Sequence, residues 1–174
     1  MHYLSHFRYC PVCGSSEFQT NDVKSKRCAD CGFTLYLNAS AATAAFIVNS
    51  RKELLVCRRA FQPAKGTLDL PGGFVDPGES ITEGMLREIK EELGVDATIS
   101  RFLFSYSNWY RYSDFDIPTA DIFFEAELQD ESSIKAGDDC SDAYWIPLSQ
   151  IDYRLFGLKS IRNAVMQYLS DFTP

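Results

Sequence analysis

An apolar residue recurs every four positions between residues 81 and 93: Ile81, Met85, Ile89 and Leu93. This spacing returns side chains to one face of a helix. Ser80 and Glu83 have the S-x-x-E spacing of a capping box, and Gly94 suits the position just past a helix C-terminus. The pattern therefore predicts an amphipathic helix from about residue 81 to residue 93.

Two apolar runs ahead of this helix have the composition of strands. Residues 39–48 pass from small residues into Phe46, Ile47 and Val48, and residues 53–59 follow a polar turn. Two such runs separated by a short turn predict a hairpin. Residues 66–73 then lead through a short strand into a glycine turn before the helix.

Further strands are predicted after the helix at residues 99–107, 119–128 and 144–148. Residues 155–169 repeat apolar side chains at helical spacing, which predicts a terminal helix that covers the sheet. Strands interleaved with two amphipathic helices predict an α/β fold, which we expect to be an α/β/α sandwich around a mixed sheet.

Four cysteines near the N-terminus form two C-x2-C pairs, Cys10 with Cys13 and Cys28 with Cys31, separated by fourteen residues. Paired thiolates at this spacing predict a tetrahedral zinc site, and four thiolates leave no open coordination position. Because so short a segment has few large apolar residues, we expect Zn2+ to be structural. The predicted organisation is a zinc ribbon at residues 1–38 and a second domain at residues 39–174.

Three glutamates lie on another face of the predicted helix. Glu88, Glu91 and Glu92 are spaced i, i+3 and i+4, so like charges crowd together on adjacent turns. A hard divalent cation, Mg2+ or Mn2+, would neutralise them. The alternative is a solvated face on which Arg87 and Lys90 supply the counter-charges.

The frame around these glutamates reads G-x5-E-x7-R-E-U-x-E-E-x-G-U, with U aliphatic, and resembles the signature of the Nudix hydrolases. All nine defined positions match: Gly73, Glu79, Arg87, Glu88, Ile89, Glu91, Glu92, Gly94 and Val95. The resemblance implies a metal-dependent enzyme that hydrolyses the pyrophosphate linkage of a nucleoside diphosphate joined to another moiety.

The resemblance also implies roles for individual residues. The metal ligands would be Glu88, Glu91 and Glu92 with the carbonyl of Gly72, while Glu79 would pair with Arg87 to hold the glycine loop against the helix. Members of the family often take a general base from a carboxylate before the last strand. Asp138, Asp139 and Asp142 lie there, of which we prefer Asp139, and a solvated acidic loop is the alternative.

An aromatic-rich segment, residues 105–115, is predicted to be a loop that recognises the substrate. Trp109, Tyr110 and Tyr112 could stack on a nucleobase, or they could pack against the ribbon or a second subunit in a homodimer. Arg58 and Arg59 could meet the diphosphate or simply flank the sheet.

A zinc ribbon ahead of this signature resembles the branch of NADH and ADP-ribose pyrophosphatases. Residues 105–110 retain little of the S-Q-P-W-P-F-P-x-S motif of the NADH enzymes. NADH, ADP-ribose, nucleotide sugars and dinucleoside polyphosphates therefore all stay open as substrates. The alternative function is a non-catalytic nucleotide or ADP-ribose sensor that acts through the ribbon on a protein or nucleic-acid partner.

Composition narrows the classes of partner. The net charge of −7 argues against a general nucleic-acid or anionic-membrane surface, which leaves a nucleotide-capped RNA end as the exception. No run of eighteen apolar residues and no signal-peptide pattern occurs, so we expect a cytoplasmic protein.

Overall fold

The computed structural model describes residues 3–112 and 115–172, in two compact units, Met1–Ala39 and Ser40–Pro174. The first unit is an antiparallel sheet of three strands, β1 (Phe18–Asp22), β2 (Ser25–Cys28) and β3 (Thr34–Tyr36). Its core consists of the buried Cys10, Phe18 and Cys28 with Phe33 and Leu35 packed against them. A core this small provides little stability through apolar burial.

The second unit contains two three-stranded sheets. In one, β8 (Phe115–Leu128) lies between β4 (Ser40–Ile47), which is parallel to it, and β7 (Ala97–Tyr112), which is antiparallel. In the other, β5 (Glu53–Arg59) lies between β6 (Leu68–Asp69) and β9 (Cys140–Pro147), both antiparallel to it.

The prediction of a hairpin between β4 and β5 is wrong, apart from the turn that joins the two strands. The turn itself is present, because the side-chain oxygen of Asn49 accepts bonds from the backbone N–H groups of Arg51 and Glu53, both at 3.0 Å. Past a single bridge between Val48 and Leu54 the strands diverge into different sheets. The two strands pair with other segments instead of with each other: β4 pairs with β8, and β5 pairs with β6 and β9.

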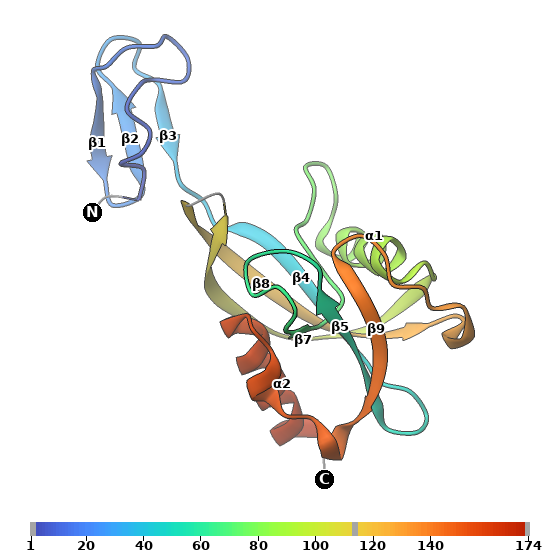
Figure 1. Ribbon diagram of the computed structural model, residues 1–174. Helices are drawn as coiled ribbons and strands as arrows, with labels where there is room; N and C mark the ends of the chain where they lie inside the picture. The colour runs from blue at the N-terminus through green and yellow to red at the C-terminus, as the bar shows by residue number, and fades with distance from the viewer. Residues whose placement is uncertain (1–2, 113–114, 173–174) are drawn as a thin grey trace. The chain divides into compact units, whose positions relative to one another are not determined.

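Two helices, α1 (Ile81–Leu93) and α2 (Lys159–Phe172), cover opposite faces of the strands (Figure 1). The strands alternate between them: Ala45 and Ile47 of β4 belong to the cluster that contains α1, whereas Ala44 and Phe46 belong to the cluster that contains α2. This two-residue period explains why β4 and β5 read as continuous apolar runs. The predicted α/β/α sandwich with a mixed sheet is confirmed.

Helix α1 has the predicted bounds and caps. The Ser80 hydroxyl accepts from the backbone N–H of Glu83, the Glu83 carboxylate accepts from that of Ser80, and Gly94 ends the helix in the left-handed conformation. Helix α2 begins later than expected, at Lys159, because Tyr153–Leu155 forms a separate 3-10 turn capped by Asp152. Neither helix is long and apolar enough to span a membrane, nor is any other in the described ranges.

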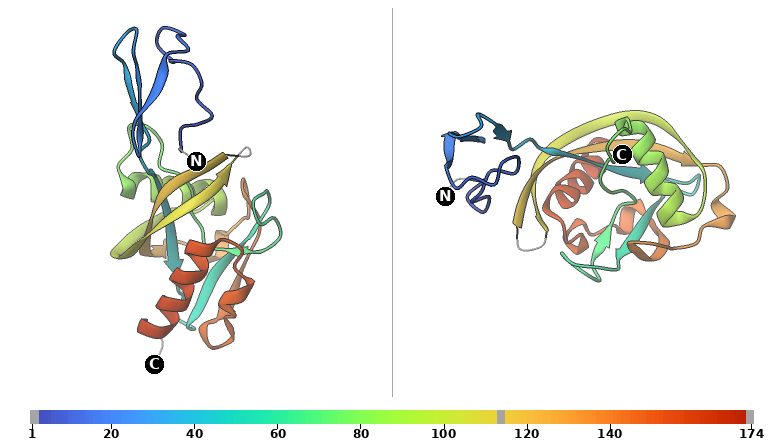
Figure 2. Two further views of the ribbon diagram at one scale, coloured as in Figure 1. Left: turned by 90° about the vertical axis from the view of Figure 1, so that its left-hand side faces the viewer. Right: turned by 90° about the horizontal axis from the view of Figure 1, so that it is seen from above.

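Strands β7 and β8 form a long curved ribbon (Figure 2), with irregular register at Ile99/Arg101 and Phe102/Phe104. Bulges of this kind bend a strand pair. The prediction of an aromatic loop at residues 105–115 is therefore wrong. The residues up to Tyr112 belong to β7, and Phe115 begins β8. Residues 113 and 114 of that segment lie outside the described residues.

Candidate active site

The glycine turn lies along the edge of β4. Backbone bonds join Ala45 N–H to the Pro71 carbonyl at 2.9 Å, Thr43 N–H to the Gly73 carbonyl at 2.8 Å, and Val75 N–H to the Ala41 carbonyl at 3.0 Å. Gly72 is needed here because a Cβ on it would lie 2.1 Å from the Thr43 carbonyl oxygen. The small residues of β4 and this glycine together let the turn lie against the strand.

Arg87 links the turn to helix α1. Its guanidinium donates to the Glu79 carboxylate at 2.7 and 3.1 Å and to the Phe74 carbonyl at 2.9 Å, and it also reaches Glu88 at 2.9 Å and Glu91 at 2.8 Å. These carboxylates, Glu79 foremost, raise the pKa of Arg87. The network holds the start of the turn and the carboxylate face of the helix together.

Glu92 is the most deeply buried carboxylate of this face, at 4% exposed. It accepts a bond from the Gly72 N–H at 3.0 Å. Burial raises its pKa well above the ordinary value, and the negative charges of Asp69, Cys140 and Glu88 raise it further. Burial likewise raises the pKa of Glu88, although Arg87 offsets part of this effect.

The donor set suits a divalent cation. Carboxylate oxygens are hard ligands, and buried carboxylates that repel one another are stabilised by a bound cation. The backbone of Gly73 also lies close to one of them, because a Cβ on Gly73 would lie 2.5 Å from the Glu88 carboxyl. Within the described residues, the group of three or more His, Cys, Asp or Glu side chains already gathered closely enough to hold a metal ion is that of the four cysteines. Arg87 instead provides the positive charge that faces Glu88 and Glu91.

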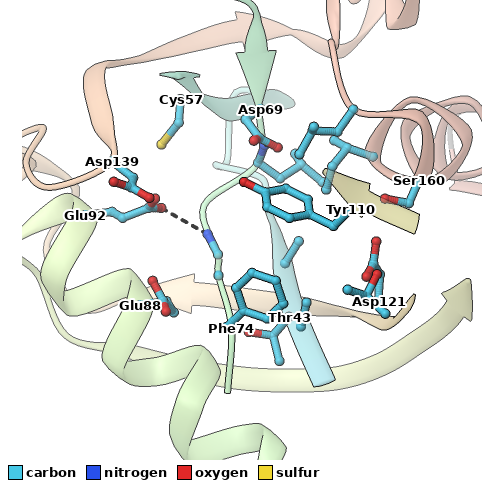
Figure 3. A pocket seen from close by; sticks show the side chains of 18 of the residues that line it. Thr43, Cys57, Asp69, Phe74, Glu88, Glu92, Tyr110, Asp121, Asp139 and Ser160 are labelled. Carbon is cyan, nitrogen blue, oxygen red and sulfur yellow. Dashed lines mark hydrogen bonds between the residues drawn. The ribbon is translucent and has the colours of Figure 1, made fainter. Parts of the chain in front are cut away.

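These groups border a cavity of about 310 Å³. Figure 3 shows Glu88, Glu92 and Asp139 on one side of Tyr110, with Asp121 and Ser160 on the other. Apolar and polar side chains from both sheets and both helices complete the lining. A cavity of this size with a few convergent polar groups is typical of a small-molecule site.

The structure separates the predicted substrate-binding residues into two groups. Arg59 and Tyr110 line the cavity, where Arg59 forms a buried ion pair with Asp69 and donates to the Tyr110 hydroxyl at 3.3 Å. Arg58 lies outside it and donates to the Gly66 carbonyl and the Tyr144 hydroxyl. Trp109 and Tyr112 also lie outside the lining, at 49% and 60% exposed.

Of the three candidate bases, Asp138 and Asp139 line the cavity, whereas Asp142 lies on β9 outside it. Sequence reasoning missed several other lining residues: Thr43, Cys57, Asp69, Asn108, Thr119, Asp121 and Ser160. Only the two-residue period of the strands could have indicated that Asn108 and Tyr110 share a face. Cys57 and Cys140, which the sequence leaves as separate residues, form a thiol pair whose hydrogen bond, together with burial, raises the pKa of Cys57.

The four N-terminal cysteines converge in the first unit. Their sulfur atoms all lie within 4.8 Å of one another, and the Cys10–Cys31 and Cys13–Cys28 sulfur distances are both 3.6 Å. Sulfurs placed tetrahedrally around zinc at ~2.3 Å would be about 3.8 Å apart. Gly14 and Gly32, both left-handed, close each knuckle through bonds to the Cys10 and Cys28 carbonyls. The cluster is thus consistent with a zinc ribbon.

Comparison with known proteins agrees with this geometry. A family model described as the NUDIX domain matches residues 38–169. The ADP-ribose pyrophosphatase of Methanocaldococcus jannaschii is 33% identical over 138 residues, which are 78% of each chain. The NAD-capped RNA hydrolase NudC of Pseudomonas aeruginosa is 26% identical over 147 residues, 84% of this chain but only 50% of that protein. The chain therefore spans about half the length of NudC.

The fold has solved counterparts. A NUDIX hydrolase from Nitrosomonas europaea superposes with a TM-score of 0.79 over 95% of this chain and 92% of that chain, at 21% identity. A MutT protein from Methanosarcina mazei gives 0.63 over 80% of this chain at 23% identity. At these identities the likeness concerns the fold alone.

Proposed function

The chain belongs to the Nudix family of hydrolases, and from that premise we propose that it cleaves the diphosphate linkage of a nucleotide of the ADP-ribose class. The observation that carries this proposal is the cavity bounded by Gly72, Gly73, Glu88 and Glu92. This cavity of about 310 Å³ joins carboxylates suited to a divalent cation with the polar side chains of Asp121 and Ser160. Similarity to an ADP-ribose pyrophosphatase over 78% of the chain supports the substrate class.

We assign Mg2+ or Mn2+ to Glu88, Glu91, Glu92 and the carbonyl of Gly72. When bound, such a cation neutralises phosphate oxygens and lowers the pKa of coordinated water. The chain itself supplies the positioning: the turn at Gly72 and Gly73 brings its backbone against the carboxylates.

Asp139 is our candidate for the general base, because it lines the cavity and lies beside Glu92 (Figure 3). Arg59 is the candidate for contact with the diphosphate, since its guanidinium lines the same cavity. Asp69 accepts from Arg59 and fixes its direction. Tyr110, between the two ends, is the candidate for packing against the substrate.

We further propose that residues 1–38 and 39–174 are separate domains, and that Zn2+ held by the four cysteines is structural. A ribbon ahead of the hydrolase domain favours one second function, removal of a nucleotide cap from an RNA end, which the similarity to NudC supports. The net charge of −7 restricts such an enzyme to the end of the RNA.

The test is hydrolysis of a substrate panel with Mg2+: ADP-ribose, NADH, nucleotide sugars, dinucleoside polyphosphates and an NAD-capped oligonucleotide. We expect cleavage of ADP-ribose, and we expect Glu92→Gln to lower kcat at least about 10²-fold, because several kcal/mol of charge stabilisation depends on the cation. Products are identified by chromatography, and circular dichroism confirms that the variant folds.

Matched aspartate variants provide the controls. Asp139→Asn should lower kcat about 10²-fold, whereas Asp142→Asn, outside the cavity, should retain full activity. Tight binding of ADP-ribose without hydrolysis of any panel member would instead favour the sensor function. Faster cleavage of the capped oligonucleotide than of free NADH would favour the RNA-end function.

A further inference from the structure

The end of the cavity away from the α1 carboxylates contains a buried polar cluster that the proposed chemistry does not use. The Asn108 side-chain amide donates to Asp121 Oδ2 at 3.1 Å and to Ser160 Oγ at 3.1 Å. These residues come from β7, β8 and the first turn of α2, and all three line the cavity. Asp121 is 8% exposed and Ser160 3%.

Thr119 indicates that this cluster is built for a ligand. Its hydroxyl is buried, lines the cavity and has no hydrogen-bond partner in the described part of the chain. Thr119 lies directly opposite Asn108 in the β7–β8 register and two residues before Asp121, so the three side chains share one face of the sheet. A buried hydroxyl without a partner is costly unless a ligand supplies one.

The charge of Asp121 defines the chemistry of that ligand. A carboxylate accepts up to about four hydrogen bonds, and Asn108 uses one of these positions. Asp121 has no ion pair within the described residues, so an incoming phosphate would meet an uncompensated negative charge. A group with two adjacent hydrogen-bond donors satisfies the carboxylate, and the hydroxyls of Ser160 and Thr119 can serve the oxygens of the same group.

We infer that Asp121 binds the vicinal diol of a ribose in the substrate, which makes it a specificity-determining residue. The inference rests on the proposed function: in ADP-ribose the first group on either side of the diphosphate is a ribose. Figure 3 shows Asp121 on the other side of Tyr110 from Glu88 and Glu92, so a diphosphate beside those glutamates would place an adjoining ribose toward Asp121. Carboxylates bind ribose hydroxyls in the same way in dinucleotide-binding folds.

The test compares ADP-ribose with two analogues, each lacking the 2-hydroxyl of one ribose. We expect the wild-type enzyme to discriminate against one analogue by roughly 10- to 100-fold in kcat/KM, because the loss of that hydroxyl leaves buried polar groups unpaired. Asp121→Asn should lower kcat/KM for ADP-ribose by a similar factor, chiefly through KM, and reduce the discrimination to about threefold or less. Asp116→Asn, an exposed aspartate on the same strand, should change neither quantity.

Three results would overturn the inference: no discrimination by the wild type, unchanged discrimination in Asp121→Asn, or a change of preference between ADP- and GDP-linked sugars instead of between ribose and deoxyribose. If Asp121→Asn does not fold, Ser160→Ala is the second variant, because it keeps the carboxylate. It should reduce the discrimination between ADP-ribose and the deoxy analogue by at least about threefold. Discrimination equal to that of the wild type in Ser160→Ala would count against the diol site. If the wild type cleaves no substrate, the proposed function fails but the ribose site is still testable. Calorimetry then compares the binding of ADP-ribose and its two analogues to the wild type and to Asp121→Asn.

Discussion

At the scale of single residues, contact with a carboxylate explains the glycine at position 73. A Cβ there would lie 2.5 Å from both Cδ and Oε1 of Glu88, closer than any real contact allows. Arg87 also donates a hydrogen bond to Glu88 Oε1 at 2.9 Å. Any side chain at position 73 must therefore displace the Glu88 carboxylate.

Gly73→Ala should lower kcat by roughly 10- to 100-fold, because a shift of about 1 Å in a catalytic group has an effect of this size. The residue is not in a left-handed conformation, so we expect only a small change in Tm. Steady-state kinetics and a thermal melt on the same preparation measure both quantities.

Gly94→Ala is the matched control. Gly94 has a φ of +74°, and the nearest atoms to an added Cβ belong to Lys135 at 3.9 Å. Alanine there should lower the free energy of unfolding by about 1 kcal/mol through backbone strain alone and leave kcat unchanged. A fully active Gly73→Ala enzyme would contradict the close-contact explanation.

At the scale of the element, the period of β7 separates two neighbouring aromatic residues. Tyr110 faces the cavity, where its ring meets Phe74 edge to face at a centroid distance of 5.5 Å. Trp109 is half exposed and outside the lining. A strand places consecutive side chains on opposite faces, so a single aromatic segment cannot present both to one ligand.

Tyr110→Ala should lower kcat/KM for ADP-ribose about 10-fold or more, since loss of one stacking partner costs ~1–3 kcal/mol. Trp109→Ala should stay within about threefold of wild type. Steady-state kinetics on both variants measure this difference. Equal losses of kcat/KM would indicate that Trp109 contacts the substrate as well.

At the scale of the whole molecule, the two compact units have different sources of stability. The unit Ser40–Pro174 packs two apolar clusters against its helices, whereas the apolar cluster found among the described residues of the unit Met1–Ala39 has three buried members, two of them Cys10 and Cys28. The proposed structural zinc would therefore contribute more to the folding of the smaller unit.

Chelation should consequently affect one unit alone. We expect about one zinc per chain by elemental analysis, and we expect its removal to expose residues 1–39 to protease while residues 40–174 stay resistant. Cys10→Ser should lose the zinc, and Cys57→Ser, outside the cluster, should retain it. A fragment pattern unchanged by chelation would contradict a structural metal.

The sequence by itself determined the features that depend on neighbours a few residues away. The capping box at Ser80, the apolar stripe of α1 and the two cysteine knuckles are set by local hydrogen bonds and helical spacing, and the structure has them as predicted. The signature of glutamates and glycines likewise lies within one short stretch of sequence and indicates the family by itself.

Only the tertiary structure decided which distant segments meet. Pairing of β4 with β8 instead of β5 depends on competition among strand edges, which no local pattern contains. The bond between Asn108 and Ser160 joins residues 52 positions apart, and of the neighbouring Arg58 and Arg59 only Arg59 lines the cavity. Helices and metal knuckles are encoded by short-range spacing, but a cavity is formed by register and packing across the whole chain.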